Sequence, residues 1–212
     1  VFGQNPFSKI HMNEAFISAV KNGDTSVVEV LLKEMKIDPS YNENFAVRLA
    51  SLNGYTDIVK ILLERHEVNL AARDNEAIRF ASKYGHTDIV RMLLERPEVN
   101  PAARINEALI FASQNGHADV VRLLLERPDV NPAAKDNDAI RWASFNGHAD
   151  VVRLLLEIPD LNPAAMDNYA IRFASLNGHT DVFRLLLERN DINPGANNNE
   201  PLINAAKARH LD

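Results

Sequence analysis

Apolar and polar residues alternate along this chain in a pattern that predicts pairs of short helices. The segment 76–82 has the apolar spacing of one buried helix face, and a second such segment starts at Thr87. Gly85 separates the two, and a glycine can adopt the left-handed conformation that often closes a helix. Pro97 ends the second helix, because proline lacks the amide hydrogen that a helix interior requires. The sequence therefore predicts a unit of helix, turn, helix and return loop.

This unit recurs with a period of 31 residues, as six glycines show: Gly23, Gly54, Gly85, Gly116, Gly147 and Gly178. A fixed period of this length is typical of repeat proteins, in which each unit packs on its neighbours. We divide the chain into an N-terminal extension or cloning remnant, residues 1–12, and a repeat array, residues 13–212. The units of the array are 13–43, 44–74, 75–105, 106–136, 137–167, 168–198 and a partial 199–212. The first and last units are expected to act as caps, because polar Ser18 and Asn204 stand where most other units carry a bulky residue.

The repeats resemble the ankyrin family. In the third unit Gly85-His86 is followed by the pair Leu93-Leu94 and then by Val99-Asn100, and this order recurs in the other complete units with few substitutions. The resemblance covers residues 13–212. It implies an all-α solenoid of helix-turn-helix units that binds other proteins in a concave groove lined by the first helices.

Two departures from the family pattern affect the return loops. The period is 31 rather than the usual ~33 residues. The family's T-P-L-H signature is replaced by sequences such as Glu76-Ala77-Ile78-Arg79. We therefore expect shortened return loops without regular β-pairing, and we do not expect binding through long loop tips.

Positions that scarcely vary between units are interpreted as structural. The core between units is expected to hold the bulky series Leu49, Phe80, Phe111, Trp142 and Phe173. The Asn that opens each unit, such as Asn75, is expected to accept a hydrogen bond from the first turn of its helix. The repeated histidines are expected to stabilise loops; they are His86, His117, His148 and His179. Neighbouring helices pack roughly 8 to 10 Å apart, too far for these side chains to share a zinc ion at about 2 Å.

The variable positions lie on the exposed side of the first helix, at positions two, five and nine of each unit, and in the loop before it; Tyr84 at position ten is added because most other units carry Asn there. These positions share one face because they are three and four residues apart. Aromatic, Met and Arg side chains are frequent there, and interface cores favour them. The candidate partner-binding residues are Phe45, Arg48, Leu52, Arg73, Glu76, Arg79, Lys83, Tyr84, Arg104, Gln114, Asp138, Arg141, Phe145, Met166, Tyr169, Arg172 and Leu176. The arginines at position five could instead support the fold through ion pairs along the helix, namely Glu76 with Arg79 and Asp138 with Arg141.

Composition narrows the class of function. The chain of 212 residues has 23 Lys and Arg against 29 Asp and Glu, a formal net charge of −6, and no Cys. The charge argues against a nucleic-acid partner, and no apolar run has the roughly 18 to 20 residues that would span a membrane. The lack of Cys fits the cytoplasm or another reducing compartment. The sequence has no phosphate-binding loop, HExxH or GxSxG motif, so we expect no enzyme activity, no metal and no cofactor.

The sequence thus predicts a non-catalytic binding module or adaptor, monomeric, that engages a protein partner. Two alternatives stay open. One is an engineered or structural repeat scaffold with no physiological partner. The other is a binding fragment of a larger effector or enzyme.

Overall fold

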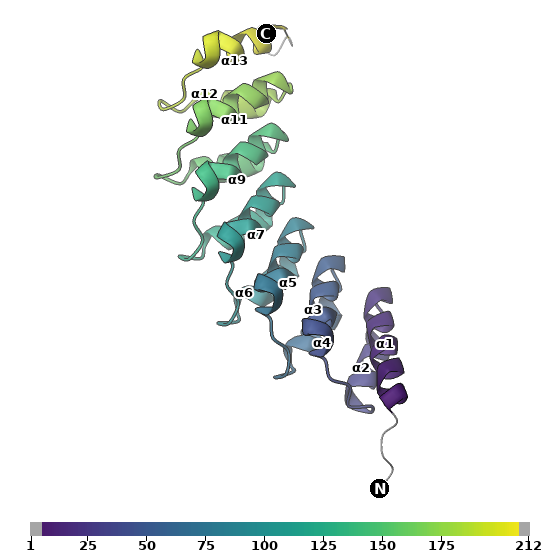
Figure 1. Ribbon diagram of the computed structural model, residues 1–212. Coiled ribbons are helices and arrows are strands. Elements are labelled where there is room, and N and C mark those ends of the chain that lie inside the picture. Colours follow the sequence, from purple (N-terminus) through teal and green to yellow (C-terminus); the bar gives the residue numbers. More distant parts are fainter. Residues whose placement is uncertain (1–5, 208–212) are drawn as a thin grey trace. The chain divides into compact units, whose positions relative to one another are not determined.

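The computed structural model describes residues 6–207, and every regular element among them is an α-helix (Figure 1). The chain divides into two compact parts, residues 1–100 and 101–212. The helices of the first part are α1 (Pro6–Asn22), α2 (Thr25–Lys33), α3 (Tyr41–Asn53), α4 (Thr56–Leu63), α5 (Ala72–Lys83) and α6 (Thr87–Leu94). Those of the second part are α7 (Ala103–Gln114), α8 (Ala118–Leu125), α9 (Ala134–Phe145), α10 (Ala149–Leu156), α11 (Ala165–Leu176), α12 (Thr180–Leu187) and α13 (Ala196–Lys207).

Within each part, helices pack in pairs, and consecutive pairs stack first helix on first helix. In the first part α3 packs on α4 and on α5, and in the second α9 packs on α10 and on α11. This is the predicted helix-turn-helix repeat, and the all-α fold class is confirmed. The return loops of the described residues contain turns and no strand, as expected from the short period. Helix α1 begins at Pro6, so it includes residues that the sequence assigned to an extension before the first unit.

The second helix of each pair folds because one side of it is apolar. In α6, Ile89, Val90 and Leu93 are completely buried, whereas Arg91 on the opposite side is exposed. Asp88 in the first turn complements the positive end of the helix dipole. Burial of one such apolar side chain contributes roughly 1.5 to 3 kcal/mol, so packing against the first helices stabilises a segment that is too short to be helical alone.

The turn between the paired helices is held by contacts between neighbouring repeats. Gly147 has φ +80°, and the ring of His179 from the next repeat covers it. The His179 ring donates from Nε2 to the Phe145 carbonyl, 2.9 Å away. His86 and His148 make the same bond to the carbonyls of Leu52 and Gln114. These contacts confirm that the three histidines stabilise loops.

In each first helix from α3 onward the second to fourth residues lie in the left-handed region, which the sequence did not predict. In α5 the φ angles of Arg73, Asp74 and Asn75 are 52°, 56° and 59°. The expected helix-capping role of Asn75 was wrong: its side-chain Oδ1 accepts a hydrogen bond from the backbone N–H of Asn100, 2.7 Å away. Asn tolerates the left-handed region better than most residues. The opening Asn therefore joins its own turn to the following return loop.

Ile105 is the least suitable residue in these turns. It is β-branched, 61% exposed and held at φ +59°, and the equivalent residues are Glu43, Asp74, Asp136, Asp167 and Asn198. We expect Ile105→Asn to raise the free energy of unfolding by about 1 kcal/mol, because the left-handed region costs Asn less than a β-branched residue. Urea unfolding followed by the fluorescence of Trp142, the only tryptophan, measures this. Ile105→Val is the control and should change nothing; equal stability of Ile105→Asn and the wild type would contradict the prediction.

Candidate functional site

The candidate site is the exposed side of the first helices, here called the first-helix face. In the first part of the chain its two position-five arginines are largely buried: Arg48 is 8% exposed and Arg79 is 5% exposed. The Arg79 guanidinium donates to the carbonyls of Asp74 (2.9 Å) and Arg73 (3.0 Å), both in the left-handed turn of its own helix. Arg48 bonds its own turn in the same way. These two side chains stabilise the turns and have little surface to offer a partner.

The arginines at position five form ion pairs both with the next repeat and within their own helix. Arg48 pairs with Glu76, one repeat further on, whereas Arg141 pairs with Asp138 of its own helix. The expected local pair is therefore found for Asp138 and Arg141.

The other predicted residues of the first part form a mixed surface. Phe45 lies beneath the Arg48 guanidinium, 5.3 Å from ring centroid to Cζ, and Leu52 is half-buried. The ring of Tyr84 is 49% exposed, with the Lys83 ammonium 5.5 Å from its centroid. Exposed Arg73 pairs with Glu43, and the hydrogen bond that its guanidinium donates to that carboxylate raises the pKa of Arg73, which stays charged.

The second part carries a continuous group of aromatic rings from α9 and α11. We call Trp142, Phe145, Phe173 and Tyr169 the aromatic row. Successive ring centroids are 5.7, 5.6 and 4.1 Å apart, and the first contact is edge to face while the last is stacked. Such contacts stabilise aromatic pairs beyond the area that they bury. All four side chains are half-buried, so the row is packed and still accessible.

Two position-five arginines flank the aromatic row. Arg141 lies over the Tyr169 ring at 5.2 Å and also bonds the carbonyls of Asp136 (3.0 Å) and Lys135 (3.2 Å). Arg172 lies 5.9 Å from the Phe173 centroid and pairs with Glu200 of α13 at 2.9 Å. Each guanidinium group therefore contacts a ring of the aromatic row and also a turn or a neighbouring helix.

The remaining predicted residues of the second part lie around the row or apart from it. Leu176 and Met166 are exposed, by 54% and 56%. The half-buried Gln114 offers its backbone carbonyl to Asn146 and to a histidine, and exposed Arg104 lies 3.7 Å from Glu107.

Sequence reasoning missed Trp142 and Phe173 as candidate site residues, because the bulky residue at the same place in every middle repeat was assigned to the core. All five members of that bulky series are half-buried rather than fully buried. The sequence did contain a signal for these two residues, namely the rings of Phe145 and Tyr169 at the variable positions. Positions two, six and nine of a unit are four and three residues apart, so rings at these positions share one face of the first helices.

The last helix is tied to the row by a pH-sensitive contact. Hydrogen bonds from Asn197 and Arg172 hold the pKa of Glu200 below its ordinary value of 4.5. A lowered pKa in the folded state means that the contact stabilises α13 fully above about pH 4.5 and that this stabilisation is lost as the pH falls through the folded value.

We therefore expect hydrogen-exchange protection of residues 196–207 to fall first when the pH is lowered from about 6 to about 3, before that of α9. The variant Glu200→Gln should show reduced protection of α13 already at neutral pH, and little further change attributable to this contact on acidification. Equal loss of protection in α13 and α9, with no effect of the variant, would contradict the role of Glu200.

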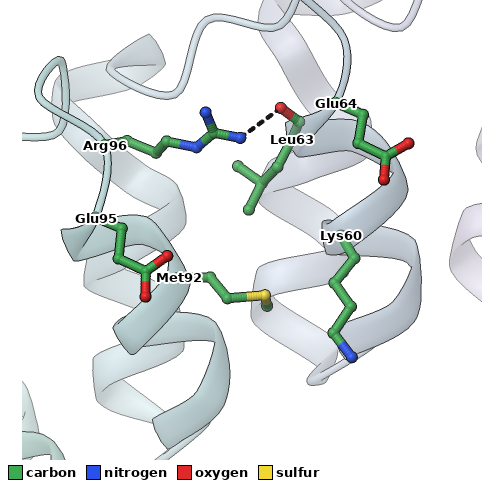
Figure 2. A pocket seen from close by; sticks show the side chains of 6 residues that line it. All are labelled: Lys60, Leu63, Glu64, Met92, Glu95 and Arg96. Carbon is green, nitrogen blue, oxygen red and sulfur yellow. Dashed lines mark hydrogen bonds between the residues drawn. The ribbon is translucent and has the colours of Figure 1, made fainter.

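Outside the first-helix face, the second helices α4 and α6 border a shallow hollow (Figure 2). Its lining mixes charged side chains with Leu63 and Met92, and Arg96 donates to the Leu63 carbonyl at 2.7 Å, where α4 ends. The hollow holds none of the predicted site residues. Among residues 6–207, no three His, Cys, Asp or Glu side chains gather as a metal site requires, and no helix is long and apolar enough to cross a membrane.

Comparison with known proteins identifies the family of this chain. The model for ankyrin repeats matches three times, over residues 16–104, 78–167 and 140–212. No curated protein sequence matches the chain. Ankyrin repeats are generally protein-interaction modules without catalytic activity. With the match spanning nearly all of the sequence, the chain belongs to the ankyrin-repeat family.

Proposed function

We propose that this chain is a non-catalytic adaptor that binds a protein partner mainly through the aromatic row, with Leu176 beside it. The observation that carries the proposal is the packing of the four rings, whose successive centroids are 5.7, 5.6 and 4.1 Å apart and which remain half-buried. A partner that covers them removes apolar surface from water, and this is the main favourable term in protein association.

The rings are also held in place before a partner arrives. Phe145 touches both Trp142 and Phe173, and Tyr169 is stacked on Phe173 beneath Arg141. Because these side chains are already ordered, binding costs little further side-chain entropy. Aromatic residues with this property dominate the energetics of most protein interfaces.

The first part of the chain supplies a weaker contact in this proposal. Phe45, Leu52, Lys83 and Tyr84 are the accessible residues there, and the exposed charge Arg73 belongs to the rim of this contact; Arg104 is an exposed charge of the second part. Rim charges contribute less than buried anchors. We further propose that the chain is a monomer. The lack of Cys supports the cytoplasm or another reducing compartment, and the net charge of −6 argues against a nucleic-acid partner.

Affinity capture from a cell lysate with the purified chain, read by mass spectrometry, tests the proposed face. Proteins retained by the wild type should be lost with Tyr169→Ser and kept with Arg122→Glu, which changes an exposed residue of the second helix α8. Circular dichroism must first show equal helix content. Retention by Tyr169→Ser with loss by Arg122→Glu would place the working surface on the second helices instead.

A further inference from the structure

The charged side chains beside the aromatic row already form ion pairs and hydrogen bonds within the chain. The side chain of Arg141 is only 14% exposed, pairs with Asp138 and bonds two carbonyls of its own turn. A carboxylate of a partner would have to displace these partners, and breaking a largely buried pair is strongly unfavourable. Arg141 is therefore a poor receptor for an acidic residue.

Arg172 and Glu200 are occupied in the same way. Arg172 is 21% exposed and lies between Glu200 and Asp167, 2.9 and 3.6 Å away. Glu200 also accepts a hydrogen bond from Asn197. Arg172 cannot turn to a partner without giving up a bond to α13 or to its own turn, and the Oε2 atom of Glu200 already accepts two hydrogen bonds.

Apart from the charges on the left-handed turns, the exposed groups around the row are apolar or amide. Leu176 presents its side chain at the end of α11. Exposed Asn146 and Asn177 use their side-chain NH₂ groups on the carbonyls of Gln114 and Phe145, 3.0 and 2.9 Å away. The oxygen of each amide is then the group that can accept a hydrogen bond from the backbone of a bound peptide.

From this charge balance we infer that the aromatic row takes an uncharged, apolar peptide segment of the partner. The inference rests on the proposed function and adds the chemical class of the ligand. Apolar side chains of the segment contact the rings and Leu176, and its backbone N–H groups donate to Asn146 and Asn177. The exposed charges nearby, Lys135, Asp136 and Asp167, are of both signs and lie on the left-handed turns, so salt has little effect on this contact.

A phage-displayed library of random peptides, selected on the full chain, tests the inference without assuming a sequence. The selected peptides should be poor in Asp, Glu, Lys and Arg and rich in apolar residues. They should bind neither Phe145→Ser nor Leu176→Ser. Because Leu176 is exposed, the second variant tests the surface even if Phe145→Ser impairs folding. Titration of a synthetic selected peptide, followed by Trp142 fluorescence, should give a Kd that changes less than about twofold between low and high salt.

Selection of acidic or basic peptides would overturn the inference, as would a Kd that weakens about tenfold with salt, since the row would then recognise charge. Failure to select any peptide that depends on Phe145 and Leu176 would overturn it as well. The proposed function fails separately, if Tyr169→Ser still captures every protein that the wild type captures. If Tyr169→Ser loses the captured proteins but the library yields charged peptides, or no peptide at all, the adaptor role is supported and the apolar segment is rejected.

Discussion

Replacing Gly147 by alanine is expected to lower the free energy of unfolding of the second part by about 3 kcal/mol. Gly147 has φ +80°, where an L-residue is strained, and an added Cβ would lie 2.5 Å from Nδ1 of His179. The ring cannot simply move away, because its Nε2 donates to the Phe145 carbonyl. Urea unfolding followed by Trp142 fluorescence reports the change at the neighbouring helix.

A double-mutant cycle separates the two causes. In the His179→Ala background the clash is absent and the backbone strain persists, so Gly147→Ala should cost at least about 1 kcal/mol less than in the wild type. Equal costs in both backgrounds would show that the ring contact contributes nothing. If Gly147→Ala lowers the free energy of unfolding of the wild type by less than about 0.5 kcal/mol, both the clash with His179 and the backbone strain at residue 147 are contradicted.

The helical pairs could be predicted from sequence because their signals are local. Apolar spacing, Gly85 and Pro97 mark where α5 and α6 end, and repetition made the assignment secure. The left-handed turns could not be predicted in the same way. Arg73 and Ile105 have no preference for positive φ, and the turn is held by a distant bond from Asn100 and by Arg79 five and six residues later.

Two of the four rings in the aromatic row could also be predicted from the repetition of the sequence. Comparison between repeats identified Phe145 and Tyr169, because these rings stand where other units have different residues. The same comparison assigned Trp142 and Phe173 to the core, since bulky residues recur there in every middle unit. It could not tell a fully buried ring from a half-buried one, because exposure depends on how neighbouring first helices pack.

Phe145→Ala is expected to weaken binding of a captured partner by about 2 kcal/mol, or about thirtyfold in Kd. Phe145 joins the rings of the two helices, so its removal divides the aromatic row. Since the side chain is only half-buried in the free chain, its truncation should reduce the free energy of unfolding less than the free energy of binding.

Arg141→Ala is the informative comparison, because the structure assigns this residue mainly to the fold. Its loss leaves the carbonyls of Asp136 and Lys135 and the Asp138 carboxylate without their donor. We expect the free energy of unfolding to fall by roughly 1 to 3 kcal/mol, while Kd changes less than with Phe145→Ala. Isothermal titration and urea unfolding of both variants measure the two effects. A large loss of affinity with unchanged stability in Arg141→Ala would mean that the guanidinium contacts the partner directly and that the bound segment carries a charge.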